Sequence, residues 1–299
     1  MHLVVQSYRA LRSIVRNGNF PSRMLLISGA ILILVGIFHI IPAILGPRDL
    51  SGPISFRKPI LFGISTGVTV LSLGWILQLV ETKHKLLLAW VIAATALLEV
   101  ALISLQPWRG EASHFNNTSP LDSFIHYTID VAVICLMLAI FWLGYFTFVQ
   151  KFHANFAMRW AVRAGMLFLQ FSCLFGVYML IYGINRVSQN QAPDIWGEAG
   201  VLKFVHGVTI HSIQILPIQV WLMTLYRWGA PTQNKAIILT TAGHTLLLAY
   251  AVLQTFQGKA RFPETLQDAN FFLLVIALLT MSLPLAPLLI DFVKSKAVP

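Results

Sequence analysis

The most polar long stretch of this chain, residues 106–130, reads QPWRGEASHFNNTSPLDSFIHYTID. It contains Arg109, His114, Asn116, His126 and Asp130 within a sequence that is otherwise strongly apolar. Histidine ligates haem and metal ions and exchanges protons near neutral pH. A guanidinium group binds carboxylates and phosphates through two parallel hydrogen bonds. These residue types therefore predict a binding site for haem, for a metal ion or for a small anion.

The spacing of two of these residues indicates a pair. His126 and Asp130 are four positions apart, so on a helix they share one face and are separated by about 6 Å along the axis. A lone carboxylate inside a membrane helix is energetically costly, so we expect His126 to pair with Asp130. Glu99, His114, His126 and Asp130 together form the ligand set that the sequence offers to a metal ion.

The elements that must position these residues are membrane helices. The chain has 299 residues, of which 57% are hydrophobic and only 11% are charged, a composition typical of a polytopic helical membrane protein. The apolar runs lack the alternation of barrel strands, and only helices or closed barrels satisfy the backbone in lipid. We therefore expect an all-α fold, a single integral membrane domain over 1–299 with about eight transmembrane helices. The runs long enough to span a bilayer are 24–46, 59–80, 86–106, 124–149, 162–184, 203–226, 236–257 and 270–293.

The net charge of +10 is explained by the orientation of the chain in the membrane. Most of the basic residues fall in segments on the same side of the membrane as the N-terminus, and this side is cytoplasmic by the positive-inside rule. Both termini are then cytoplasmic, residues 1–23 form an interfacial amphipathic segment, and the loop 107–123 lies outside. Because the positive charge has this explanation, no nucleic-acid partner is expected.

Depth in the membrane brings several polar residues into one layer. At 1.5 Å per residue, His39 and Glu99 lie about 10 Å below the outer boundary, His206 about 5 Å and His211 about 12 Å. Ionisable groups in hydrocarbon usually face the interior of a bundle. We therefore predict a polar site in the outer half of the bilayer with His39, Glu99 and His211 as its floor. Its lid would be the loop that carries Arg109, His114 and Asn116.

The sixth expected span has its own geometry. His206 and His211 are five residues apart, about 140° around a helix, so they do not ligate one ion from the same face. Gln214 shares the face of His211 and is expected to hold that imidazole in place by a hydrogen bond, and Pro217 permits a kink. The alternative for each membrane histidine is a purely structural hydrogen bond to a neighbouring helix.

Two basic residues precede the second expected span. Arg57 and Lys58 stand there, and Arg109 follows the third span, so all three lie at the outer interface. They are suited to clamp a carboxylate or phosphate. The alternative is that they extend toward lipid headgroups.

Three segments carry a family resemblance. GPISFRKPILFG, RGEASHFN and HGVTIHSIQILP resemble stretches of an uncharacterised family of bacterial multi-pass membrane proteins with RGxxSHFN and HxxxxHxxQxLP motifs. The resemblance implies the same architecture in a bacterial cytoplasmic (inner) membrane, and it implies no reaction. The chain is also similar to the haem A synthases in its number of helices and membrane histidines, but it lacks their signatures. The positions that match the first family are Arg57, Lys58, Arg109, His114, Asn116, His206, His211 and Gln214.

Three classes of function are consistent with these residues. The first is a redox protein that binds haem b or a transition metal, with His39 and His211 as axial ligands and Arg57 and Arg109 at the propionates. The second is a cofactor-free transporter or receptor that binds a small anionic ligand in the same cavity. The third is a structural or assembly subunit. Besides the lipid bilayer, the expected partner is a small anionic ligand or a redox partner at the outer face, and the sequence leaves open whether the protein is an enzyme.

Overall fold

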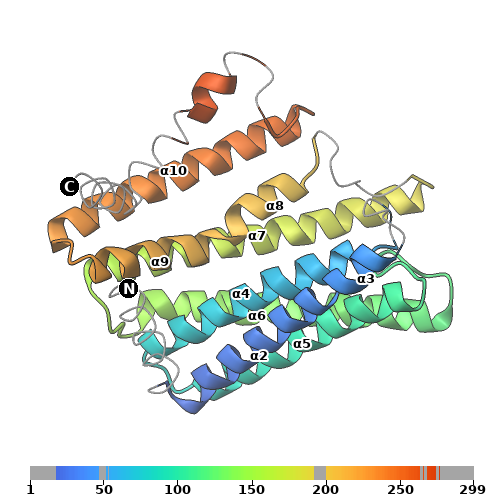
Figure 1. Cartoon of the computed structure of the whole chain (residues 1–299), viewed down its shortest axis with the longest axis horizontal. Helices are drawn as coiled ribbons and strands as arrows, with labels where there is room; N and C mark the ends of the chain where they lie inside the picture. The colour runs from blue at the N-terminus through green and yellow to red at the C-terminus, as the bar shows by residue number, and fades with distance from the viewer. Residues whose placement is uncertain are drawn as a thin grey trace, which may run out of the picture.

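The structure is a computed structural model that describes residues 18–46, 52, 54–191, 200–262, 265, 268–273 and 276. Helices make up its regular structure (Figure 1), and the described residues contain no strand beyond one isolated antiparallel bridge between Val80 and Phe152. In chain order the helices are α2 (Phe20–Phe38), α3 (Ile40–Leu45), α4 (Arg57–Leu79), α5 (Lys85–Trp108), α6 (Pro120–Val149), α7 (Phe156–Ser188), α8 (Lys203–Ile210), α9 (Ser212–Leu225) and α10 (Ala230–Phe256).

The expected fold class is confirmed, because the chain is an all-α polytopic bundle. Within the described residues, seven helical segments are long and apolar enough to cross a membrane, with α2 and α3 forming one of them and α8 and α9 another. Large apolar side chains such as Phe124 (68% exposed) and Leu34 (65%) face outward, as lipid contact requires. The eighth expected span, 270–293, lies outside the described residues apart from 270–273 and 276, and so does most of the amphipathic segment 1–23.

Several helices begin earlier than their apolar runs because a polar residue caps them. The side chain of Ser119 accepts a hydrogen bond from the backbone N–H of Asp122 at the start of α6, and Asn155 does the same for Met158 at the start of α7. Pro120 occupies the first turn of α6, where the lack of an N–H costs nothing. The caps therefore add a polar first turn to each span.

Glycines bring α2 and α4 into close contact. Gly36 and Gly63 face each other so closely that a Cβ added at Gly63 would lie 2.6 Å from the Gly36 Cα. Gly29 and Gly67 form a second crossing point, where an added Cβ on either would lie 2.7 Å from the other's carbonyl oxygen. Small residues at helix interfaces let backbones approach in lipid, where packing replaces the hydrophobic effect.

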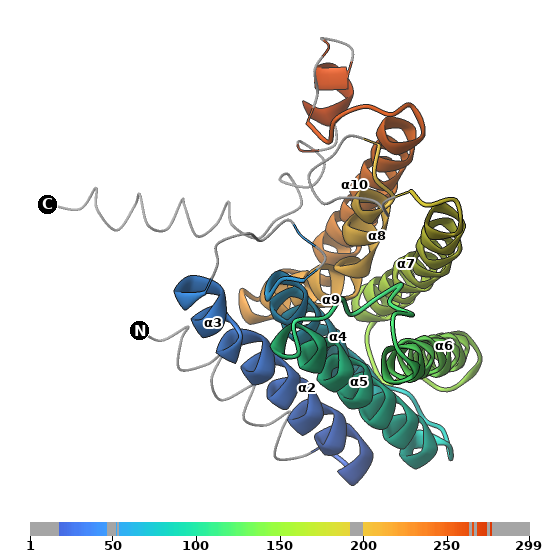
Figure 2. The same cartoon turned by 90° about the vertical axis from the view of Figure 1, so that its right-hand side faces the viewer.

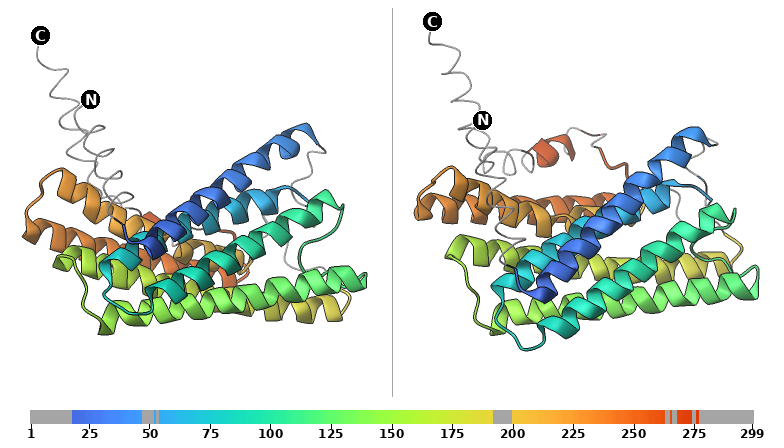
Figure 3. Two further views of the ribbon diagram at one scale, coloured as in Figure 1. Left: turned by 90° about the horizontal axis from the view of Figure 1, so that it is seen from below. Right: turned by 60° about the horizontal axis from the view of Figure 1, so that its bottom comes forward.

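The helices run side by side along one long axis. Viewed nearly end on, α2, α4 and α5 form one side of the bundle, α6 and α7 lie next to them, and α8 and α10 follow (Figure 2). Helix α2 runs obliquely to α6 (Figure 3). The loop 109–119 closes one end of the bundle. The segments 80–84 and 150–155 lie at the other end and are joined there by hydrogen bonds from Glu81 N to Lys151 O (3.0 Å) and from His153 N to Leu79 O (2.9 Å).

Two of the spans are interrupted, each at a histidine. His39 separates α2 from α3, with Pro42 three residues later, and His211 separates α8 from α9, with Pro217 six residues later. A proline cannot donate to the carbonyl four residues before it and clashes with it, which bends or breaks a helix. The bend in the sixth span is visible where α8 meets α9 (Figure 1). It lies at His211, six residues before Pro217, and Pro217 itself lies inside α9.

Candidate functional site

The ring of Phe115 anchors the loop 109–119 to the bundle. Phe115 adopts a left-handed backbone conformation (φ 57°), and its ring lies so close to α7 that a Cβ at Gly183 would be 2.3 Å from the Phe115 Cζ atom. The same ring contacts the imidazole of His126 on α6, with 6.1 Å between centroids. The loop therefore covers the ends of α6 and α7 in one defined conformation.

Arg109 forms an ion pair with Asp122 at the start of α6, and this pair is called the Arg109–Asp122 lock below. One of its guanidinium nitrogens lies 2.8 Å from the Asp122 carboxylate, and the same nitrogen donates to the side-chain oxygen of Gln106. The amide nitrogen of Gln106 donates to the same Asp122 oxygen at 3.2 Å. Ser119 and Thr118 donate to the second carboxylate oxygen. The geometry thus gives Arg109 an internal partner.

Asn116 organises the loop from within. Its side chain is 5% exposed, and its amide nitrogen donates to the Glu111 carboxylate (3.0 Å) and to the Ala112 carbonyl (3.2 Å). Its amide oxygen accepts from the backbone N–H and the hydroxyl of Thr118. All of these contacts lie inside the loop, so Asn116 fixes the position of its neighbours.

A chain of hydrogen bonds connects α4 to the loop. The ammonium group of Lys58 donates to Ser113 Oγ at 3.3 Å, and Ser113 Oγ lies 2.9 Å from Nδ1 of His114. The His114 ring packs on Phe62 of α4, 5.7 Å between centroids. The hydroxyl of Ser113 therefore links the ammonium group of Lys58 to the imidazole of His114.

The electrostatic surroundings of His114 are cationic. Part of its surface remains accessible, yet enough protein surrounds the ring that burial, the largest cause, lowers the pKa of His114 to about 3. The charges of Lys58, His126 and Lys203 lower the pKa further in the same direction. Arg57 adds its positive charge next to Lys58. The imidazole is therefore neutral and sits among groups that attract an anion.

The expected contact between His126 and Asp130 is confirmed. Nε2 of His126 lies 3.7 Å from an Asp130 carboxylate oxygen, and the two side chains are 5% and 19% exposed. Nδ1 of His126 is buried and has no hydrogen-bond partner among the described residues. His126 thus combines one acidic neighbour with one open nitrogen close to the loop.

His39 has partners at both ring nitrogens. Nδ1 lies 2.7 Å from the Val35 carbonyl oxygen, and Nε2 accepts from the indole N–H of Trp108 at 3.1 Å. The ring also packs on Phe56, with 6.1 Å between centroids. His39 thereby ties the break between α2 and α3 to the end of α5.

His206 and His211 are placed differently from each other. Nδ1 of His206 lies 3.0 Å from Ser172 Oγ and 2.9 Å from the Ser172 carbonyl oxygen on α7. His211 is exposed at the helix break. No hydrogen bond, ion pair or ring contact among the described residues joins either of them to His39.

Gln214 supports the break itself. Its amide oxygen accepts from the hydroxyl of Thr69 on α4 at 3.2 Å, which leaves its nitrogen to donate to the carbonyls of Ile210 (3.2 Å) and His211 (3.0 Å). These are carbonyls at the end of α8. Gln214 therefore binds the backbone at His211 and leaves the imidazole alone.

Glu99 stands apart from the rest of the predicted metal set. It is 5% exposed on the buried face of α5 and lies near Cys173 of α7. It forms no hydrogen bond with a described residue. In the part of the chain that the structure describes, no three His, Cys, Asp or Glu side chains come together as a metal site requires. The structure brings His114 and His126 together and leaves Glu99 separate.

Three contributors to this end of the molecule had no role assigned from the sequence. Asp122 had a local signal, since the pattern Ser119-Pro-Leu-Asp122 is a capping box that precedes an apolar run. Ser113 lies inside the RGxxSHFN motif, and Lys203 begins the sixth span. Their roles depend on which helices are neighbours, and a single sequence does not give that information.

The class of protein is thus a polytopic helical membrane protein whose loop 109–119 covers one end of the bundle, with a cationic cluster beneath it. No family model, curated protein or solved structure matches the chain. The resemblance carried by RGEASHFN and HGVTIHSIQILP therefore stays a prediction.

Proposed function

We propose that the protein is a cofactor-free membrane transporter or receptor that binds a small anion beneath the loop 109–119. Lys58 would provide the main charge, Ser113 and His114 hydrogen bonds, and Lys203 additional positive potential. The loop lies on the outer side in the topology predicted from the charge distribution, so the ligand would enter from there.

One observation carries this proposal. Lys58 donates its single hydrogen bond among the described residues to a neutral hydroxyl, and it forms no ion pair with any of them. The charges that act on it come from Lys203 and Arg57, which are cationic as well. An ammonium group that has no acidic partner among the described residues is unfavourable in a membrane protein unless an anion binds to it. A lysine ammonium is a common ligand for phosphate and carboxylate groups.

Haem b or a transition metal is the competing proposal, and the hydrogen bonds weigh against it. Axial ligation requires the lone pair of one imidazole nitrogen, and at His39 that lone pair already accepts from Trp108. Arg109, expected at a propionate, is bound to Asp122. A redox role would thus require the outer end of the bundle to rearrange.

The proposal is tested by titration calorimetry of the full-length chain in detergent with inorganic phosphate, acetate and succinate. Lys58→Gln is expected to weaken binding of the best anion about tenfold, the effect of one lost charge-assisted contact, whereas Lys58→Arg retains most of it. Lys235→Gln, an exposed lysine at the opposite end, is the matched control.

Two results would contradict the proposal. One is binding that Lys58→Gln and Lys235→Gln weaken equally. The other is the absorption spectrum of a b-type haem in the purified protein that disappears in His211→Ala, because the redox proposal would then replace this one.

A further inference from the structure

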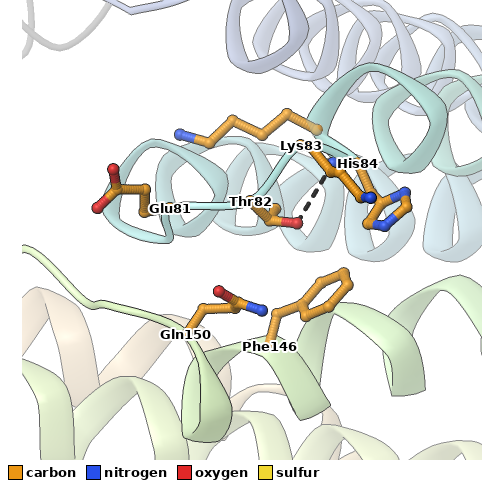
Figure 4. Close-up of a pocket in the computed structure, with 7 residues that line it drawn as sticks. Glu81, Thr82, Lys83, His84, Phe146 and Gln150 are labelled. Atoms are coloured by element: carbon orange, nitrogen blue, oxygen red, sulfur yellow. Dashed lines mark hydrogen bonds between the residues drawn. The ribbon is translucent and has the colours of Figure 1, made fainter.

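A second polar site lies at the opposite end of the bundle. A depression of about 560 Å³ opens between the segment that precedes α5 and the end of α6 (Figure 4). Ligand sites for small molecules typically have volumes of about 300–1,000 Å³. Its lining residues are Glu81, Thr82, Lys83, His84, Lys85, Phe146 and Gln150.

Aromatic packing makes the inner wall of this depression rigid. The imidazole of His84 stacks on the ring of Phe146 with 5.8 Å between centroids and an interplanar angle of 3°, and it also contacts Trp142 at 5.1 Å. The backbone bridge between Val80 and Phe152 holds the two segments that flank the wall. The polar groups of Thr82 and Gln150 lie across the opening from each other (Figure 4).

The charge of the depression is positive once its one acid is accounted for. Glu81 is turned toward the neighbouring segment, with its carboxylate 3.3 Å from His153 Nε2 and 3.9 Å from Lys151 Nζ. Lys83 forms no ion pair or hydrogen bond with a described residue. Lys85 forms no hydrogen bond or ion pair with a described residue, and the charge of Glu81 acts on it from a greater distance. Two lysines therefore line a cavity that also offers a hydroxyl, an amide and an imidazole.

We propose that this depression binds a phosphate group, supplied either by the headgroup of an anionic lipid or by free phosphate. Both lysines directly precede the apolar part of α5, so they lie at the depth where headgroup phosphates lie. Each lysine near an anionic surface contributes about 1 kcal/mol of attraction, and the enclosed wall adds shape to that charge. The site is independent of the anion site beneath the loop 109–119, which lies at the other end of α5.

The test compares two double variants that remove the same charge from the same end of the protein. Lys83→Gln/Lys85→Gln empties the depression of its cations, and Arg159→Gln/Lys235→Gln removes two exposed cations outside it. Full-length protein in nanodiscs of phosphatidylglycerol and phosphatidylcholine is examined by native mass spectrometry for retained lipid. The same proteins in detergent are titrated with inorganic phosphate.

Lys83→Gln/Lys85→Gln is expected to reduce retained phosphatidylglycerol, or to weaken phosphate binding, about tenfold. The control variant Arg159→Gln/Lys235→Gln is expected to change either quantity less than about twofold. Lys83→Arg/Lys85→Arg should restore most of the binding, and circular dichroism checks that all variants are folded. Retained lipid that phosphate does not displace identifies the headgroup as the source, whereas saturable phosphate binding identifies the free ion. Equal losses of binding in the two double glutamine variants overturn the proposal. So does the absence of binding of both phosphatidylglycerol and phosphate to the natural protein.

Discussion

Replacement of Arg109 by methionine separates a structural lock from a ligand clamp. The guanidinium lies 2.8 Å from the Asp122 carboxylate, and the two side chains are 28% and 3% exposed. Asp122 is therefore shielded from water, so its charge depends on protein partners. Methionine retains much of the arginine's apolar volume and removes the charge. We expect Arg109→Met to destabilise the fold and to leave the contacts of Lys58 intact.

The expected loss of stability depends on the hydrogen bonds that Asp122 retains when Arg109 is replaced. Removing one partner of a fully buried ion pair costs about 3–5 kcal/mol. Here Ser119 and Gln106 still donate to the carboxylate, and Arg109 is partly exposed, so the expected loss falls below that range, at about 2–3 kcal/mol. Asp122→Asn alone should cost a similar amount, because it leaves the guanidinium without its acid.

A double-mutant cycle isolates the pair from the loop. In the Arg109→Met background, Asp122→Asn should cost less than in the natural protein, with a coupling energy of about 1–2 kcal/mol. The assay is unfolding in mixed micelles with increasing sodium dodecyl sulfate, followed by far-ultraviolet circular dichroism. Arg163→Met is the matched control, because Arg163 donates to the Thr147 carbonyl at 2.8 Å and has no carboxylate partner among the described residues.

The cycle has a clear negative result. If Arg109→Met leaves the free energy of unfolding unchanged but abolishes anion binding, Arg109 is the ligand clamp that its position in the sequence had suggested. Zero coupling to Asp122, with equal losses for Arg109→Met and Arg163→Met, would refute the lock as well.

Two further predictions concern packing and pH. Gly63→Ala should lower the free energy of unfolding by about 1–3 kcal/mol because the new methyl group meets the backbone of Gly36. Gly207→Ala, where an added Cβ has nothing within 4 Å, should raise the free energy of unfolding by up to about 1 kcal/mol. Equal values for the two variants would show that α2 and α4 are not in close contact. Because the folded-state pKa of His114 is about 3, below the ordinary value of about 6.5, the unfolded chain takes up the proton first, and stability should fall as pH decreases from about 6.5 toward 3. His114→Phe should reduce that slope by up to about 1.4 kcal/mol per pH unit, and an unchanged slope in pH-dependent unfolding would contradict the assignment.

The transmembrane architecture could be predicted from the sequence because the lipid bilayer constrains each span separately. Each span must satisfy its own backbone and present apolar side chains, so an apolar run carries the information by itself. The ends of the helices were less certain, since caps such as Ser119 and Asn155 are polar and extend a helix beyond its apolar run. The breaks at His39 and His211 had only partial signals, Pro42 and Pro217, which lie three and six residues beyond them.

The candidate site was predictable in depth but not in rotation about the helix axes. A rise of 1.5 Å per residue gives the height of a residue in the membrane, so His39, Glu99 and His211 were assigned to one layer. Which way each side chain points depends on the neighbouring helices. His39 turns to Trp108, and His211 lies exposed at a helix break. Height alone therefore grouped residues that the bundle keeps apart.

Arg109 and Lys58, two of the cations that the sequence places at the outer rim, are distinguished by the carboxylates that they contact. The loop 109–119 and the first turn of α6 contain two acids, Glu111 and Asp122. Asp122 binds Arg109, and Glu111 accepts from the amide of Asn116. Among the described residues Lys58 donates only to a hydroxyl, and a hydroxyl does not neutralise an ammonium group. A rim cation that holds an internal carboxylate stabilises the loop, whereas one without an internal carboxylate remains available to an external anion, so Lys58 is the residue on which binding should depend.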